Sequence, residues 1–214
     1  MAAGTQQPHI RGRTIKAMCS LVAAGAMLAA TSSVAQANLI LVGGTPQASF
    51  TDIGGQGFGA APRMLTEQTK DLESGFETPV DVEHGDAIDG ANKSNTPTLA
   101  DLGWDSGAHV GIGFNSDQTG QTGITLNTLV LTIFNGTTPI QSFSLQSPVQ
   151  FSASDLALQQ GNGNAVFKFA LDATEQGQFD AIVAQPGSGG FFAGLSSSLG
   201  CAGTPSATCQ PSNE

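Results

Sequence analysis

The sequence predicts an all-β fold, an antiparallel β-sandwich of the jelly-roll type with one short helix near the C-terminus. Two observations lead to this prediction. The apolar segments are short and are separated by Gly, Asn, Ser and Pro, which is typical of a sandwich of roughly eight to ten strands rather than of alternating βα units. Only one segment combines helical periodicity with capping residues at both ends.

The N-terminus has the order of regions found in secretory signal peptides. Arg11, Arg13 and Lys16 precede an uncharged stretch over 17–30, and the small-residue triplet at 35–37 follows. The apolar stretch is shorter than the roughly 20 residues that cross a bilayer as a helix. We therefore expect a signal peptide over 1–37, export, and no membrane attachment after cleavage.

The remaining chain predicts one β-sandwich domain over 38–199 and a tail over 200–214. Cys201 and Cys209 lie in this tail. Two cysteines at close spacing in an exported protein indicate a disulfide, so we expect a disulfide loop here.

Acidic residues dominate the charge of the exported part. The whole chain has 17 acidic and seven basic residues, and three of the basic ones lie in the signal segment, so the remainder carries −13. Such a charge repels a phosphate backbone and argues against nucleic acid as a partner. It suits divalent cations or cationic partners.

Nine segments carry strand signals. They cover 38–42, 49–53, 76–82, 110–114, 124–134, 138–145, 149–152, 165–171 and 191–195. The segment 60–69 is ambiguous, and 83–108 is predicted to be a long polar loop around an apolar patch at 99–104.

The clearest signal is a hairpin. Alternating apolar residues over 124–134 and 138–145 flank Asn135-Gly136, and this pair supplies the positive φ angles of a type I′ turn. In the strand 165–171, Phe167 and Phe169 share a face that should point inward.

One helix is expected after this strand. Asp172 can cap it, with Glu175 completing a capping box, Phe179 and Ile182 share a face, and Pro186 ends it.

A dense group of carboxylates in the polar loop raises the question of calcium, which takes six to eight oxygen ligands. The spacing is not that of an EF-hand, so a solvated loop and a calcium site both remain open. The candidate ligands are Asp81, Glu83, Asp86, Asp89 and Asp105.

No motif singles out a reaction, and we predict a protein that is not an enzyme, without catalytic or cofactor-binding residues. Gly187-Ser188-Gly189 lacks the full frame of a hydrolase nucleophile. His84 and His109 are too few for a convincing metal site. Trp104 is expected to pack in the core rather than to present a stacking surface.

Several segments together resemble the exported region of PEP-CTERM-type bacterial proteins. They are Lys93-Ser94, 96–103, 110–115, 126–132 and 166–172. The resemblance implies a bacterial envelope protein associated with exopolysaccharide, and it supplies no catalytic residues. It departs from the family pattern at its end, where Ser212-Asn213-Glu214 stands in place of a sorting signal. We expect either a freely released protein or one that lacks an edge strand.

These observations lead to three functional hypotheses. The first is a secreted or envelope-associated non-catalytic module that contacts extracellular polysaccharide. The second is a calcium-dependent carbohydrate-binding domain, which requires the acidic loop to converge on one point. The third is a secreted hydrolase, which requires a perturbed carboxylate pair or a base within reach of a nucleophile.

Overall fold

The computed structural model describes residues 38–52, 62–68, 72–80, 84–88, 90, 93–116, 123–159 and 165–201. The predicted signal peptide and most of the predicted C-terminal tail lie outside these ranges, so both stay predictions. No helix within the described ranges is long and apolar enough to cross a membrane.

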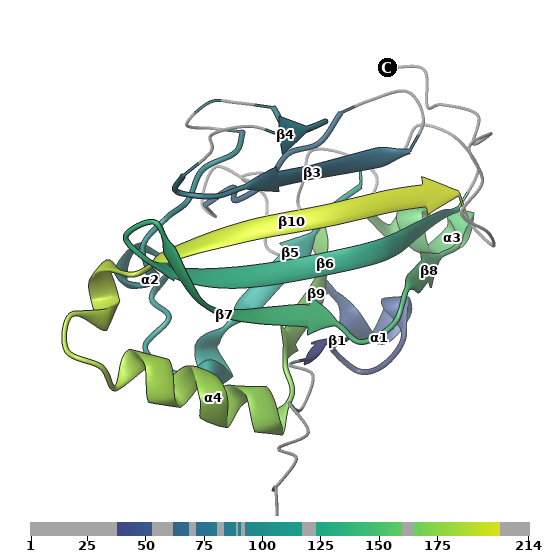
Figure 1. Cartoon of the computed structure of the whole chain (residues 1–214). Coiled ribbons are helices and arrows are strands. Elements are labelled where there is room, and N and C mark those ends of the chain that lie inside the picture. Colours follow the sequence, from purple (N-terminus) through teal and green to yellow (C-terminus); the bar gives the residue numbers. More distant parts are fainter. Residues whose placement is uncertain are drawn as a thin grey trace, which may run out of the picture. The chain divides into compact units, whose positions relative to one another are not determined.

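The described residues form ten strands, four α-helices and three short 3-10 helices (Figure 1). The strands are β1 (Asn38–Leu41), β2 (Phe50–Asp52), β3 (Glu73–Glu77), β4 (His84–Gly85), β5 (Gly111–Phe114), β6 (Ile124–Asn135), β7 (Thr138–Leu145), β8 (Val149–Phe151), β9 (Ala165–Leu171) and β10 (Phe192–Cys201). The helices are α1 (Pro46–Ser49), α2 (Leu99–Leu102), η2 (Gly107–His109), α3 (Ala153–Leu156), η3 (Ala157–Gln159), α4 (Ala173–Val183) and η4 (Ser188–Gly190).

The strands form a sandwich whose two layers belong to one hydrogen-bonded sheet, in the order β2-β9-β1-β7-β6-β10-β3-β4. In addition, β5 pairs with β9 and β8 pairs with β6. One layer contains β7, β6, β10 and β3, and the strands β5 and β9 lie behind it (Figure 1). The all-β sandwich expected from the sequence is confirmed.

Strand β1 joins the two layers. It pairs antiparallel with β9 and parallel with β7, where Asn38 and Leu39 face Ser144 and Leu145. This is the one parallel pair among the described strands; the other pairings are antiparallel.

Aromatic side chains fill the space between the layers. The rings of Phe151 and Phe167 lie 4.6 Å apart between centroids, and Phe114 stacks on Phe151 at 5.2 Å. Phe167 and Phe169 are fully buried, as the alternation along β9 predicts.

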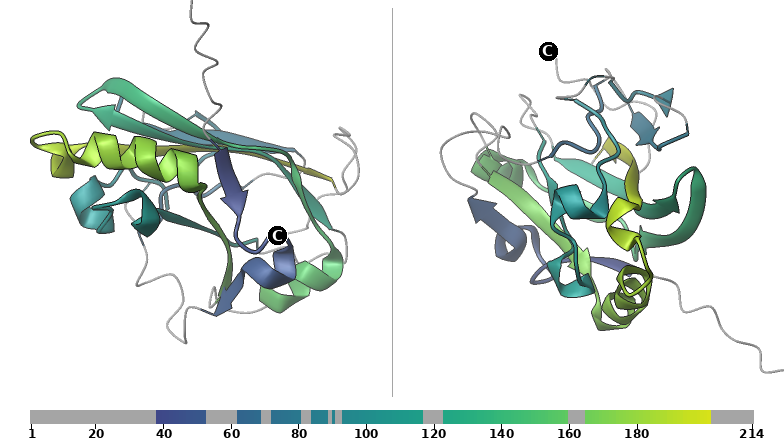
Figure 2. Two further views of the ribbon diagram at one scale, coloured as in Figure 1. Left: turned by 90° about the horizontal axis from the view of Figure 1, so that it is seen from below. Right: turned by 90° about the vertical axis from the view of Figure 1, so that its left-hand side faces the viewer.

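Helix α4 closes one end of this core. Asp172 caps it by accepting hydrogen bonds from the backbone N–H groups of Thr174 and Glu175. Phe179 packs between Phe143 of β7 and Trp104, with ring centroids 6.1 and 6.3 Å away. Trp104 is therefore a core residue, 6% exposed, as expected. Figure 2 shows α4 beneath the long strands of the front layer.

The hairpin β6–β7 is confirmed, but its turn is shifted by one residue. Asn135 still pairs with Thr138, so the two loop residues are Gly136 and Thr137. Gly136 has φ 60°, the positive value that the first loop residue of I′ and II′ turns requires.

Strand β6 contains a bulge that shifts its alternation. Thr128 faces Ser198 and Leu126 faces Leu199, which leaves Asn127 as an extra residue. Inward-facing residues therefore change from even positions before the bulge, such as Leu126, to odd positions after it, such as Leu131.

Helix α2 lies inside the segment predicted to be a loop. Thr98 and Asp101 form a capping box, and Gly103 ends the helix with φ 66°. Two further boundaries differ from prediction. β3 covers Glu73–Glu77 rather than 76–82, and β10 is longer than the expected 191–195.

Candidate functional site

The front layer presents a surface that we call the outer face. Leu129, Leu131 and Ile133 of β6 are buried, so the residues between them point to the opposite side of the sheet. The pairing of β6 with its neighbours extends this face over four strands. Its residues are Ser74, Phe76, Thr78, Thr128, Val130, Thr132, Ser142, Ser144, Gly194, Ser196 and Ser198.

The outer face is rich in hydroxyl groups, and none of the described residues that form it carries a charged side chain. Two pairs of hydroxyls bond across strands, Thr128 to Ser198 at 2.8 Å and Thr132 to Ser142 at 2.9 Å between oxygens. Each hydroxyl offers one donor and two acceptor positions, so both pairs retain capacity for a further partner.

A shallow hollow of about 200 Å³ lies in this face. It is lined by Phe76, Thr78, Thr132, Gly194, Leu195 and Ser196. Gly194 lines the hollow with its backbone, and a Cβ at this position would lie 2.8 Å from both the Phe134 ring and the Glu77 carbonyl oxygen. The glycine therefore allows the strands and the Phe134 ring to meet closely beside the hollow.

On the opposite side of β10, a carboxyl group contacts a serine. Ser197 donates a hydrogen bond from Oγ to Oε2 of Glu67 at 2.6 Å. The other oxygen of Glu67, Oε1, is buried and has no hydrogen-bond partner among the described residues. It lies beside the backbone of Gly75, where a Cβ would come within 3.0 Å of it.

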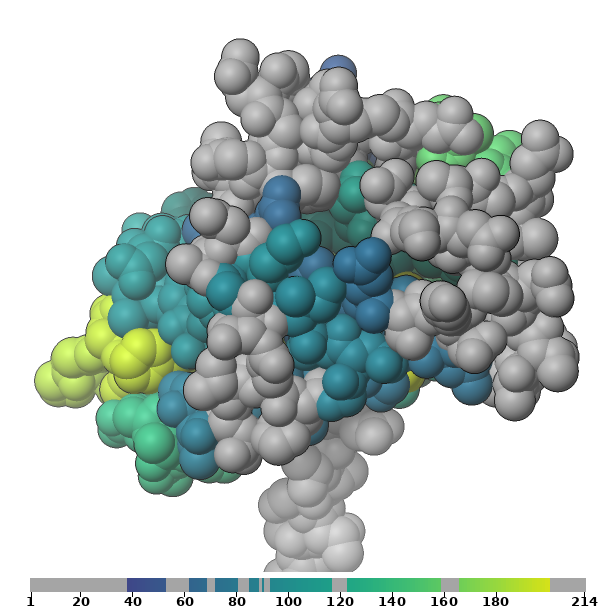
Figure 3. Space-filling view, turned by 90° about the horizontal axis from the view of Figure 1, so that it is seen from above, coloured from purple at the N-terminus to yellow at the C-terminus, as the bar shows by residue number. Residues whose placement is uncertain are grey.

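Burial raises the pKa of Glu67 to about 7, because water no longer stabilises its charged form. The hydrogen bond from Ser197 and the backbone of Gly75 oppose the rise, whereas the carboxylates of Glu73 and Asp86 add to it. Glu67 therefore changes its charge near neutral pH. Figure 3 shows the molecule from above, with described residues of 62–68, 72–80 and 84–88, in blue, next to those of 93–116, in teal.

The acidic residues predicted to bind calcium are only partly described. Asp81, Glu83 and Asp89 lie outside the described residues. Asp86 accepts a hydrogen bond from the backbone N–H of Ser74 at 2.9 Å. Within the described ranges, no group of three or more His, Cys, Asp or Glu side chains could hold a metal ion. The calcium site stays a prediction.

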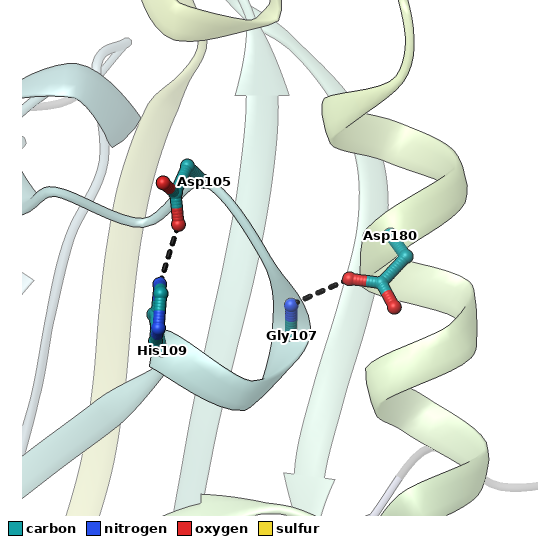
Figure 4. Close-up of polar contacts among 4 residues, drawn as sticks. All are labelled: Asp105, Gly107, His109 and Asp180. Atoms are coloured by element: carbon teal, nitrogen blue, oxygen red, sulfur yellow. Dashed lines mark hydrogen bonds and ion pairs between the residues drawn. The ribbon is translucent and has the colours of Figure 1, made fainter.

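Asp105, the last of the five, belongs to a different contact. Its Oδ1 lies 2.5 Å from Nδ1 of His109 (Figure 4), and this hydrogen bond and the charge of His109 lower the pKa of Asp105. In the same turn, the backbone N–H of Gly107 donates to Asp180 of α4 at 2.7 Å. The bond between Gly107 and Asp180 attaches the turn to α4, and the contact between Asp105 and His109 lies within the turn.

The predicted disulfide is not described. The backbone of Cys201 ends β10, and Cys209 lies outside the described residues. The pairing therefore stays a prediction.

Sequence reasoning missed both the outer face and the contact between Glu67 and Ser197. Residues 196–198 are all serine, so the sequence shows no alternation in polarity there and does not indicate which of these serines faces the core. Glu67 lies in the segment 60–69, which the sequence left ambiguous.

Comparison with known proteins finds no matching family model, curated protein or solved structure.

Proposed function

We propose that this protein is a secreted or envelope-associated, non-catalytic β-sandwich module that contacts extracellular polysaccharide through its outer face. The observation that carries the proposal is a four-strand surface of hydroxyl groups without charge in a strongly acidic chain. Sugar hydroxyls are both donors and acceptors, so paired serine and threonine hydroxyls suit them as partners.

The size of the hollow supports an extended ligand. At about 200 Å³ it is smaller than the roughly 300–1,000 Å³ of pockets that enclose small molecules. A long polymer that contributes part of its length fits such a surface better than a small molecule. The proposal also agrees with what the resemblance to PEP-CTERM-type proteins implies.

The test is electrophoresis of the protein, without its signal segment, through gels that contain polysaccharides. We use hydroxyethyl cellulose, galactomannan, dextran, alginate and polygalacturonate. Retardation by at least one of them is expected, and Ser196→Arg, which fills the hollow, should abolish it. Ala181→Arg adds the same charge on the exposed side of α4 and should leave it unchanged. Unretarded migration in every gel contradicts the proposal.

The contact between Ser197 and Glu67 favours a second candidate, a secreted hydrolase. A carboxylate that titrates near neutral pH and lies 2.6 Å from a serine hydroxyl has the arrangement of a base and a nucleophile. Against it, Ser197 lies within strand β10 and not on the strained turn that exposes a hydrolase nucleophile. Turnover of p-nitrophenyl esters that Ser197→Ala abolishes and Ser198→Ala preserves would establish this activity.

A further inference from the structure

We infer that the ligand of the outer face is an uncharged, extended glycan that lies across the strands, with one sugar unit over the segment after β3 and one over each of β10, β6 and β7. This inference rests on the proposed function and adds the chemical class of the polysaccharide, its direction and the length that is recognised.

The charge distribution disfavours an anionic glycan. The exported part has 17 acidic and four basic residues, so an anionic chain approaches against the net field of the protein. Among the described residues that form the outer face, none is a Lys or Arg that would offset this repulsion. An uncharged glycan meets no such barrier, and its hydroxyls find neutral partners there.

The lining of the hollow points to this direction, because it comes from three neighbouring chain segments, which are the end of β3 with the residues after it, β10 and β6. Gly194 faces Thr132, and Thr132 faces Ser142, while Thr78 of the chain after β3 lies beside Gly194. We call these four residues the hollow row. It runs at right angles to the strands, from the segment just after β3 across β10, β6 and β7. Three of them line the hollow, and the hydroxyl pair of Thr132 and Ser142 continues beyond it.

A second row on the same face lacks these features. Ser74, Ser198 and Thr128 form it, and it crosses three strands, because the pairing of β7 with β6 begins at Val130. None of its residues lines the hollow. The two rows thus carry similar hydroxyls but differ in shape, because of the two only the hollow row borders the recess that a sugar ring can enter.

The spacing of the strands suits this direction. Neighbouring strands lie about 4.8 Å apart, close to the length of one sugar unit in an extended glycan. Along a strand, residues on one face recur only about every 6.7 Å. A glycan across the strands therefore repeats its contacts with each unit, whereas one along a strand falls out of step.

Aromatic and polar contacts complete the recess. Phe76 is partly buried at its edge, and the apolar face of a sugar ring can stack on it. Thr78, Thr132 and Ser196 surround the ring with hydroxyls. This combination of one apolar contact and several neutral polar ones is suited to a sugar and gives no advantage to a charged group.

The test compares two threonines of one strand. Thr132 and Thr128 both lie on β6 and both bond to a serine hydroxyl, but they are about 13 Å apart. We expect retardation by hydroxyethyl cellulose or galactomannan and none by alginate or polygalacturonate. Thr132→Arg should reduce the affinity at least tenfold, and Thr128→Arg should reduce it by a clearly smaller factor, because Thr128 does not line the hollow. Ala181→Arg, on the exposed side of α4, should leave the affinity unchanged. Circular dichroism verifies that all three variants fold.

Chain length supplies a second measurement. Calorimetric titration with cello- or manno-oligosaccharides of two to six units should show affinity rising up to about four units and then levelling, because the hollow row has four positions, one on each of four neighbouring chain segments. Three results overturn the inference while the proposed function stands. They are an equal loss of affinity in Thr132→Arg and Thr128→Arg, an affinity that continues to increase beyond four sugar units, and retardation of the protein by the anionic gels. Absence of retention in every gel instead rejects the proposed function itself.

Discussion

Replacement of Glu67 by Gln should abolish one component of the pH dependence of stability. The pKa of this carboxyl rises from its ordinary value of 4.5 to about 7 in the folded protein. Because the folded state holds its proton more tightly than the unfolded state, the stabilisation is fully present below pH 4.5. It is lost progressively as the pH rises towards 7 and then levels off.

The size of the pKa shift of Glu67 determines how much the free energy of unfolding changes with pH. A rise from 4.5 to about 7 corresponds to at most roughly 3 kcal/mol, with a slope near 1.4 kcal/mol per pH unit inside the window. Gln keeps an oxygen that can accept the hydrogen bond from Ser197 but never becomes charged. At pH 4 the two proteins should therefore differ by no more than about 1 kcal/mol. Above pH 7 the variant should be the more stable one.

Urea unfolding at intervals between pH 4 and 8.5 measures this difference. Subtracting the free-energy curve of the variant from that of the wild type removes the contribution of every other titrating group that the substitution does not affect. Glu73→Gln serves as a control, because removing the neighbouring charge should lower the pH at which Glu67 titrates without abolishing the effect. Parallel curves for the wild type and Glu67→Gln would refute the argument.

Two further predictions concern packing around α4. Glu175 is 1% exposed and its Oε2 has no hydrogen-bond partner among the described residues, so Glu175→Met should raise the free energy of unfolding by about 1 kcal/mol in urea titration; a loss of stability would show that the carboxyl is needed. A Cβ at Gly107 would lie 2.4 Å from Cα of Gln176, so Gly107→Ala should destabilise by about 1–3 kcal/mol. Gly189→Ala is the matched control, because its nearest atom is 3.7 Å away, and equal effects of the two substitutions would contradict the clash.

The sandwich follows from the sequence where polarity alternates strongly. In β9, Phe167 and Phe169 mark the buried face, and the strand starts and ends where predicted. The hairpin is equally plain, because long alternating segments flank Gly136. These elements are stabilised by the hydrophobic contrast that the sequence displays.

Other features depend on contacts that sequence patterns do not encode. The serines at 196–198 have no contrast in polarity, so the length of β10 is set by its pairing with β6 and β3. Helix α2 did have a local signal, the Thr98 and Asp101 capping box followed by Gly103, which the surrounding polar residues obscured. Glu67 meets Ser197 across 130 positions, and only the fold brings them together.

The central place of β1 bears on the order in which the chain folds. This strand of four residues lies between β7 and β9. Its partner residues in those strands, Ser144 and Leu171, are more than a hundred positions away in the sequence. The β6–β7 hairpin needs only a two-residue loop and can form early, whereas β1 gains its partners only after long loops close. We expect β1 to pair with β7 and β9 late in folding and thereby to join the two layers. The first residues of the described chain would thus be among the last to reach their native positions.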